Sequence, residues 1–267
     1  MRGYAIGGRG AGVVLLHSSL SSRTQWKRLA AELERGYHVL AVDLLGYGEA
    51  PAVADPDSYT LRDETARILA LADACFGRCA RFHVVGHSYG GLAALAFARE
   101  HPARVAGLAV YEPVCFNLAP AGDPDLGFLR QVAATIAMHV RAGRLIEAAG
   151  LFVDYWNGPG AFGLLPPAAQ ARMVQGIAKV PLDFQAAFLE PRIAHAYSGI
   201  AAPTLLMGGT HSPRLTRGML KTLASAIPGA ALSLVEGGHM APVTTPDHFN
   251  LMIGSFLDWT APVARAA

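Results

Sequence analysis

The sequence is poor in charged and aromatic residues, and it contains no long apolar run. Charged residues make up 16% and aromatic residues 8% of the 267 positions, against 52% hydrophobic residues, so a disordered chain is excluded and a sizeable aliphatic core is expected. The formal net charge is only +2, which is too small for a phosphate-binding surface, so we expect no nucleic-acid partner. A membrane-spanning helix needs about 18 consecutive apolar residues. No such stretch is present, and no membrane association is expected.

The three cysteines are too few for a disulfide framework. Cys75 and Cys79 would share a helix face but have no nearby partner ligands, which makes a poor zinc site. Cys75, Cys79 and Cys115 are all expected to be small buried apolar residues. The apolar run 13–16, which follows two arginines, is too short for a signal peptide, so a cytoplasmic protein is expected.

Short apolar runs alternate with helical patterns along most of the chain. The length and the Val and Leu content of these runs predict parallel strands buried on both faces, at 13–16, 37–42, 82–85, 105–111, 203–207 and 231–235. The intervening apolar spacing predicts helices at 24–34, 61–76, 90–100, 216–226 and 246–259. Strands that alternate with helices predict an α/β fold with a mostly parallel, doubly wound sheet.

Residues 113–199 interrupt the alternation. This interval contains no convincing strand and has helical patterns at 125–141, 145–156, 167–179 and 183–197. It is too long for a plain loop in a compact domain, so it predicts a helical insertion over one end of the sheet. The predicted domains are a core of residues 1–112 and 200–267 and a helical cap, or lid, of residues 113–199.

Residues 86–90 read Gly-His-Ser-Tyr-Gly and match the pattern G-x-S-x-G. The pattern alone is weak, but here Ser88 follows a predicted strand and precedes a helix of small residues, which is the setting of a nucleophile elbow. Bulky side chains at Gly86 or Gly90 would clash with the neighbouring strand and helix. We therefore predict that Ser88 is a catalytic nucleophile.

A serine nucleophile needs a base and donors for the developing oxyanion. His239 lies in a Gly-Gly-His segment just after the last predicted strand, where the base of a hydrolase triad is expected. One oxyanion donor is predicted to be the backbone N–H of Tyr89, directly after the nucleophile, and the second is predicted to come from the loop 17–22.

Together these segments resemble the α/β-hydrolase superfamily. The resemblance rests on His17-Ser18-Ser19, the segment 43–48, the motif 86–91 and Gly237-Gly238-His239, and it covers residues 1–112 and 200–267. It implies an eight-stranded sheet, an active site beneath a cap, and neither a metal nor an organic cofactor. Many members have His-Gly after the first parallel strand, where this chain has His-Ser. By matching position, the second oxyanion N–H belongs to Ser19, with Ser18 close by.

The acid of the triad departs from the family pattern. The resemblance places an Asp after the strand 203–207, but His211 occupies that position, and no Asp or Glu occurs between residues 190 and 236. Glu112, at the end of the strand next to the nucleophile strand, is the predicted substitute, as in haloalkane dehalogenase-like members. Alternatively, Glu112 only bonds backbone groups at the cap hinge. Asp123 and Asp125 are weaker candidates.

Aromatic and apolar side chains in the cap predict a largely apolar pocket. Phe152 and Trp156 from the cap, together with Ser18, are the candidate substrate-binding residues. The predicted partner is a small-molecule acyl substrate, and the oligomeric state stays open. The sequence thus predicts a carboxylesterase-like serine hydrolase that cleaves a small to medium, largely apolar carboxylic ester or related acyl compound through a Ser-His-Glu triad and an acyl-enzyme.

Two groups of alternatives remain. The same triad could serve a C–C bond hydrolase, a lactonase, a thioesterase or a cofactor-free lyase, because the fold does not fix the chemistry. The replacement of the usual Asp by His211 also leaves open a non-catalytic ligand-binding protein on this fold. A contact between Glu112 and His239 would weaken that second alternative.

Overall fold

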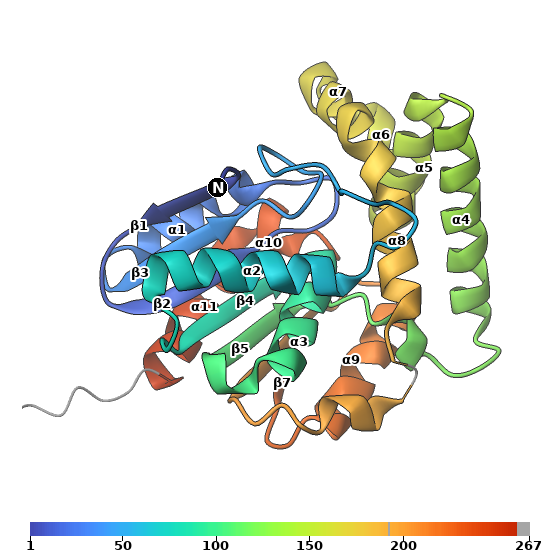
Figure 1. The fold of residues 1–267 in the computed structure, drawn as a ribbon. Coiled ribbons are helices and arrows are strands. Elements are labelled where there is room, and N and C mark those ends of the chain that lie inside the picture. The colour runs from blue at the N-terminus through green and yellow to red at the C-terminus, as the bar shows by residue number, and fades with distance from the viewer. Residues whose placement is uncertain (192, 261–267) are drawn as a thin grey trace, which may run out of the picture.

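A computed structural model describes residues 1–191 and 193–260, which fold around one seven-stranded sheet (Figure 1). The strands are β1 (Tyr4–Gly7), β2 (Ala11–Leu16), β3 (Tyr37–Val42), β4 (Phe82–His87), β5 (Val105–Tyr111), β6 (Thr204–Gly209) and β7 (Ala231–Val235). The α-helices are α1 (Lys27–Leu33), α2 (Leu61–Phe76), α3 (Tyr89–Glu100), α4 (Pro124–Arg141), α5 (Leu145–Asn157), α6 (Ala161–Leu164), α7 (Pro167–Gly176), α8 (Val180–Leu189), α9 (Arg214–Ala226), α10 (Ala241–Thr244) and α11 (Pro246–Thr260). Short 3-10 turns, η1 (Arg23–Trp26), η2 (Pro102–Arg104), η3 (Phe116–Leu118), η4 (Ile177–Lys179) and η5 (Ala194–Tyr197), join several of them.

The strand order is β1-β3-β2-β4-β5-β6-β7, and every pair is parallel except β1 with β3. The six predicted parallel strands are present. β1 was not predicted, and the resemblance implied eight strands where the described residues form seven. The difference lies before β2. There the single strand β1 pairs directly with β3, with Tyr4 opposite Val42, where an eight-stranded sheet would have a two-stranded hairpin. Gly8 and Gly10, both with positive φ, make the turn from β1 to β2.

Helices cover both faces of the sheet, which confirms the doubly wound α/β architecture. Figure 1 shows α2 and α3 in front of the sheet and α1 and α11 behind it. Two apolar clusters correspond to these two sides. The first joins the sheet to α2, α3 and α9, and the second joins it to α1 and α11. Because helices pack on both faces, the central strands β2, β4 and β5 are almost wholly buried.

Helices α4 to α8 stand together beyond one end of the sheet, at the right in Figure 1. They occupy the interval in which the sequence predicts helices and no strand. The single helix predicted over 183–197 is wrong, because α8 ends at Leu189 and the separate turn η5 follows. Glu190 precedes Pro191 and is extended (φ −65°, ψ 158°), as expected for a residue before proline.

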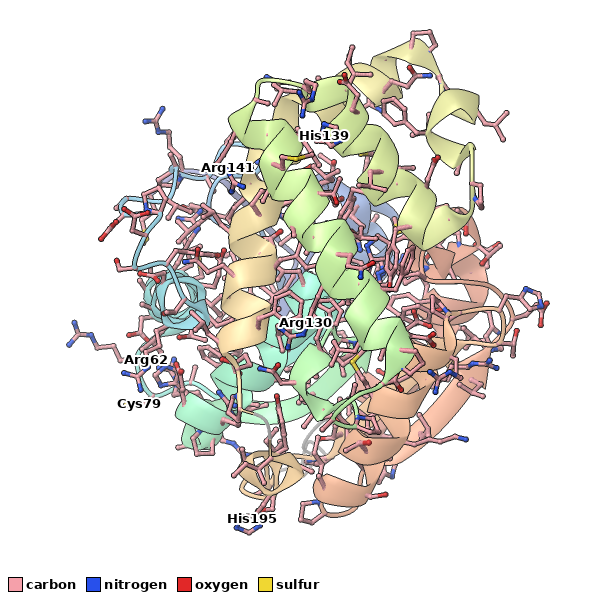
Figure 2. The ribbon with its side chains drawn as sticks, turned by 90° about the vertical axis from the view of Figure 1, so that its right-hand side faces the viewer. Arg62, Cys79, Arg130, His139, Arg141 and His195 are labelled. Carbon is pink, nitrogen blue, oxygen red and sulfur yellow. The ribbon has the colours of Figure 1, made fainter. Side chains whose placement is uncertain are left out.

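Two expectations about burial are also corrected. β7 is the edge strand of the described sheet, and its Leu232 and Leu234 are 40% and 51% exposed, so this strand is not buried on both faces. Cys115 is buried as predicted, but Cys75 is half-buried, and Cys79 lies on the surface beyond the end of α2 (Figure 2). Among the described residues, no helix has the length and apolar character needed to cross a membrane.

Candidate active site

Ser88 occupies a sharp turn between β4 and α3. Its backbone has φ 55° and ψ −117°, a region that non-glycine residues rarely adopt. The flanking glycines allow the turn. A Cβ on Gly86 would come within 2.4 Å of the Gly90 carbonyl oxygen, and a Cβ on Gly90 would come within 2.4 Å of the carbonyl oxygens of Leu16 and His17. The turn therefore holds the Ser88 hydroxyl at the carboxyl edge of the sheet in a backbone conformation that only close packing maintains.

A hydrogen-bonded chain joins Ser88, His239 and Glu112. His239 Nε2 lies 2.9 Å from Ser88 Oγ, and His239 Nδ1 lies 2.7 Å from Glu112 Oε2. His239 follows β7 and Glu112 follows β5, so three strand ends contribute one residue each. Glu112 is completely buried and His239 is 3% exposed. An imidazole with a carboxylate on one nitrogen and a hydroxyl on the other can take the hydroxyl proton as a general base.

The Glu112 carboxylate bridges the ends of two strands. Besides His239, it accepts a hydrogen bond at 2.7 Å from the backbone N–H of Gly209, the last residue of β6. Glu112 itself has φ 43°, and its own N–H donates to the carbonyl of Met207 in β6. The carboxylate of Glu112, which follows β5, thus occupies the space after β6, where the family resemblance places an Asp.

The other candidate acids have different surroundings. His211, at the position of the usual Asp, is on the surface with its side chain 69% exposed, 3.2 Å from the exposed Glu236. Asp123 caps the N-terminus of α4 and, like Asp125, pairs with Arg214. None of these side chains contacts His239 through a hydrogen bond among the described residues.

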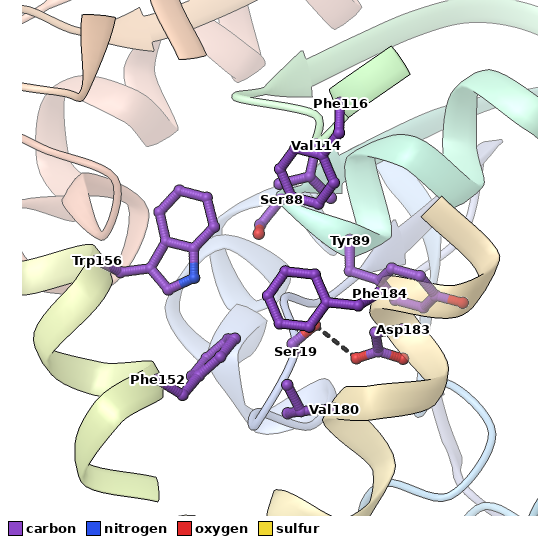
Figure 3. A pocket seen from close by; sticks show the side chains of 10 residues that line it. All are labelled: Ser19, Ser88, Tyr89, Val114, Phe116, Phe152, Trp156, Val180, Asp183 and Phe184. Carbon is purple, nitrogen blue, oxygen red and sulfur yellow. Dashed lines mark hydrogen bonds between the residues drawn. The ribbon is translucent and has the colours of Figure 1, made fainter. Parts of the chain in front are cut away.

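The loop after β2 lies beside the elbow. Ser19 and Tyr89, the two predicted oxyanion donors, line one cavity together with Ser88 (Figure 3). Tyr89 is the first residue of α3, so its backbone N–H has no carbonyl partner within the helix. Such an amide, at the positive end of a buried helix, is suited to bind a developing negative charge.

A second hydrogen-bonded chain supports this loop from behind. The N–H and hydroxyl of Ser18 both donate to Gln25 Oε1, at 3.1 and 3.0 Å. Gln25 Nε2 donates to His87 Nδ1 at 3.1 Å, and His87 Nε2 donates to the carbonyl of His239 at 2.8 Å. Burial lowers the pKa of His87 well below its usual value, and the nearby His239 lowers it further. A neutral His87 accepts on one nitrogen and donates on the other, as this chain requires.

A buried polar cluster, which the sequence did not predict, joins helix α8 to the loop after β2. Asp183 of α8 accepts hydrogen bonds from Ser19 Oγ at 2.5 Å and from Tyr47 Oη at 2.6 Å. Lys179, one helical turn earlier, forms an ion pair with Asp183 and donates to Tyr59 Oη at 2.8 Å. The only advance signal was the Lys-Asp pair at i and i+4. The residues that meet it come from distant segments.

The cluster continues under Tyr89. Tyr59 Oη lies 2.5 Å from Glu64 Oε1 and 2.7 Å from Tyr89 Oη. Burial raises the pKa of Glu64, although the charge of Lys179 opposes the shift. Burial also raises the pKa of Tyr89. Lys179 thus lies among two carboxyl groups and three tyrosines, and the cluster connects α8 to the segments that surround Ser88.

Two cavities meet at Ser88, and Ser19, Phe152 and Trp156 line both. The outer cavity has a volume of ≈ 300 Å³ and includes Ser18, His239 and several apolar side chains: Leu20, Val153, Leu165, Met173, Met240 and Val243. The inner cavity has a volume of only ≈ 20 Å³ and extends from Ser88 toward α8 (Figure 3). The Trp156 ring stacks on the imidazole of His239, with centroids 3.8 Å apart.

The predicted substrate-binding residues therefore all border the cavities, but Ser18 does so with its hydroxyl hydrogen already donated to Gln25. The cap arginines lie elsewhere. Arg130 stacks over the Phe188 ring, and Figure 2 shows Arg130 and Arg141 on the outside of the molecule. Both of them and Arg144 are exposed and line neither cavity. The sequence did not single out Gln25, His87, Lys179 or Asp183.

The chain belongs to the alpha/beta hydrolase family, whose model matches residues 13–249. Pyrrolizixenacetamide deacetylase of Xenorhabdus hominickii is 26% identical over 259 residues, which cover 95% of this chain and 93% of that protein. The enol-lactonase from Burkholderia xenovorans superimposes with a TM-score of 0.79 at 24% identity and covers 96% of this chain and 95% of its own. A thermophilic esterase from Thermogutta terrifontis gives a TM-score of 0.74 at 20% identity, covering 97% and 93% of the two chains.

Proposed function

We propose that this protein is a carboxylesterase-like serine hydrolase in which Ser88 is the nucleophile, His239 the general base and Glu112 the acid. The observation that carries the proposal is the chain of short hydrogen bonds from Glu112 through His239 to Ser88. A contact between Glu112 and His239 weakens the ligand-binding alternative, and the two side chains lie 2.7 Å apart. In this proposal residues 113–199 act as the cap over the site.

The proposed reaction follows from the positions of these atoms. His239 Nε2 takes the Ser88 proton while Oγ bonds to the acyl carbon, and the backbone N–H groups of Tyr89 and Ser19 bind the oxyanion. Nε2 then gives that proton to the leaving heteroatom, and the bond from carbon to that atom breaks. A water molecule, deprotonated by His239, attacks the acyl-enzyme and releases the acid and free Ser88.

Glu112 keeps the proton of neutral His239 on Nδ1 and stabilises the imidazolium. The substrate class follows from the cavities. Apolar side chains dominate the outer cavity, and none of the described residues that line it is a lysine or an arginine. We therefore propose a small to medium, largely apolar carboxylic ester or a related acyl compound. The deacetylase relative, similar over nearly the whole chain, adds acyl amides to the substrates worth testing.

The test combines covalent labelling with turnover. A fluorophosphonate probe, p-nitrophenyl acetate and p-nitroacetanilide are offered to the wild type and to Ser88→Ala. We expect labelling and ester hydrolysis by the wild type and neither by the variant. Gly122→Ala is the control for the effect of a substitution outside the site. Gly122 lies in an exposed loop with open space around it, so despite its positive φ we expect this variant to keep the wild-type labelling and turnover. A folded wild type that neither reacts with the probe nor hydrolyses either substrate refutes the proposal.

A further inference from the structure

We infer that the site is specific for a short acyl group, acetyl or propionyl, carried on a larger apolar leaving group. This inference rests on the proposed function and assigns its two halves to the two cavities at Ser88. The inner cavity takes the acyl chain, and the outer cavity takes the leaving group.

The position of His239 decides which cavity takes which half. In the proposed reaction, the imidazolium gives its proton to the leaving heteroatom, so that atom must lie near Nε2. His239 lines the outer cavity and not the inner one. The acyl carbon bonded to Ser88 Oγ carries the acyl chain on the side away from the leaving group. That side is the inner cavity, which Ser88 and Tyr89 border without His239 (Figure 3).

The two cavities differ greatly in size. The inner cavity has a volume of ≈ 20 Å³ and the outer one ≈ 300 Å³. A cavity needs a volume of about 10–15 Å³ on this measure to hold one water molecule. The inner cavity therefore has room for one or two water-sized groups, such as the methyl of an acetyl or the ethyl of a propionyl group, and is too small for a butyryl chain. The outer cavity can hold an aromatic or branched leaving group.

The side chains that line the inner cavity are too tightly packed to move aside for a longer acyl chain. Val114, Phe116 and Val180 are at most 4% exposed, and Phe184 stacks on Phe116 with ring centroids 5.9 Å apart. At the far end is Asp183, whose carboxylate is held by Ser19, Tyr47 and Lys179. A longer acyl chain would have to displace α8 and break this buried cluster. Packing and charge thus both limit the acyl length.

The experiment varies the acyl chain and keeps the leaving group constant. We compare kcat/KM for p-nitrophenyl acetate, butyrate and hexanoate. A surplus methylene in a tight apolar pocket changes kcat/KM by about 10- to 200-fold. We expect the wild type to prefer acetate over butyrate by about tenfold or more, with hexanoate slower still.

Substitutions at Phe184 and Met173 test which cavity limits the length of the acyl chain. Phe184→Ala opens the inner cavity, and we expect it to raise hexanoate relative to acetate at least about tenfold, with a smaller shift in the same direction for Phe184→Leu. Met173→Ala enlarges only the outer cavity, so it should alter the preference between ethyl and naphthyl acetate and leave the acyl-chain profile unchanged. Phe128→Ala is the matched control, because Phe128 is 59% exposed and lines neither cavity.

The outcomes separate the two proposals. A wild type that labels with fluorophosphonate but hydrolyses hexanoate as efficiently as acetate overturns the acyl limit and leaves the hydrolase proposal intact. A shift of the acyl profile by Met173→Ala in place of Phe184→Ala also overturns it, because the chain would then occupy the outer cavity. No labelling and no turnover of any ester refutes both proposals. Should Phe184→Ala not fold, the wild-type profile and Phe184→Leu still decide.

Discussion

Replacing Glu112 by Gln removes one negative charge and preserves the shape of the side chain. The carboxylate accepts from the Gly209 N–H at 2.7 Å and contacts His239 Nδ1 at 2.7 Å. A glutamine carbonyl can keep the bond to Gly209, which leaves the NH₂ group facing Nδ1. Because that group donates, Nδ1 must accept, and the imidazole proton moves to Nε2. Nε2 is the atom that has to take the Ser88 proton.

The expected loss has two parts. A charge pair about 4 Å apart is worth about 4 kcal/mol at an effective dielectric constant near 20, and Glu112 would no longer offset the imidazolium charge by that amount. Each 1.36 kcal/mol corresponds to about tenfold in rate, so this part alone gives about 10³-fold. Loss of the correct tautomer in a comparable triad lowers kcat by about 10⁴-fold. We therefore expect Glu112→Gln to reduce kcat by about 10³- to 10⁴-fold.

The assay is hydrolysis of p-nitrophenyl acetate by the wild type, Glu112→Gln and His211→Ala, with thermal unfolding of each protein. His211 is the matched control, since it occupies the position of the usual acid but is exposed. We expect His211→Ala to retain wild-type activity and both variants to stay folded. A folded Glu112→Gln within about tenfold of the wild type would refute the assignment of the acid, as would a comparable loss in His211→Ala.

Three further predictions concern the surroundings of the site. Lys179→Met leaves the buried Asp183 without its cation and should lower the free energy of unfolding by about 3–5 kcal/mol in urea denaturation; an effect below about 1 kcal/mol would contradict the cluster's role. Trp156→Ala removes the ring stacked on His239 and should reduce kcat/KM about fivefold, because a cation–π contact is worth about 1 kcal/mol, whereas Trp156→Phe should retain most of the activity. Burial lowers the pKa of His17 from 6.5 to about 4, so the unfolded chain binds a proton between these pH values and the folded chain does not. The contribution of His17 to the free energy of unfolding should therefore fall by about 3 kcal/mol from pH 6.5 to pH 4, in addition to that of His87, and His17→Gln should reduce the measured slope by this amount.

Features set by local sequence could be predicted closely. The strands 37–42, 105–111 and 231–235 and the helix 61–76 have the bounds that the apolar pattern indicates. β1 was missed because Tyr4–Gly7 is short and half-exposed, without a buried run to mark it. The helix predicted over 183–197 failed because its apolar spacing continues past Pro191, although the backbone does not.

The parts of the site also differ in how far the sequence alone could predict them. Contact between Glu112 and His239 could be anticipated because the parallel strands that precede them, β5 and β7, end at the same edge of the sheet. The cluster around Asp183 could not, since nothing local indicates that Lys179 in the cap meets Tyr59 and Tyr47 from the core. The size difference between the cavities depends on side-chain packing such as that of Phe184 on Phe116, which no periodicity encodes.

The position of Glu112 has a consequence for how the enzyme can change over evolutionary time. Ser88 and Glu112 follow residues that are register partners, His87 in β4 and Tyr111 in β5, and one crossover helix connects these strands. Two members of the proposed triad thus belong to a single β-α-β unit encoded upstream of residues 113–199. Insertions, deletions or exchange of those helices can remodel the cavities without altering the spacing of this pair. The chain after residue 199 then has to position only His239, so the proposed cap would be a replaceable module.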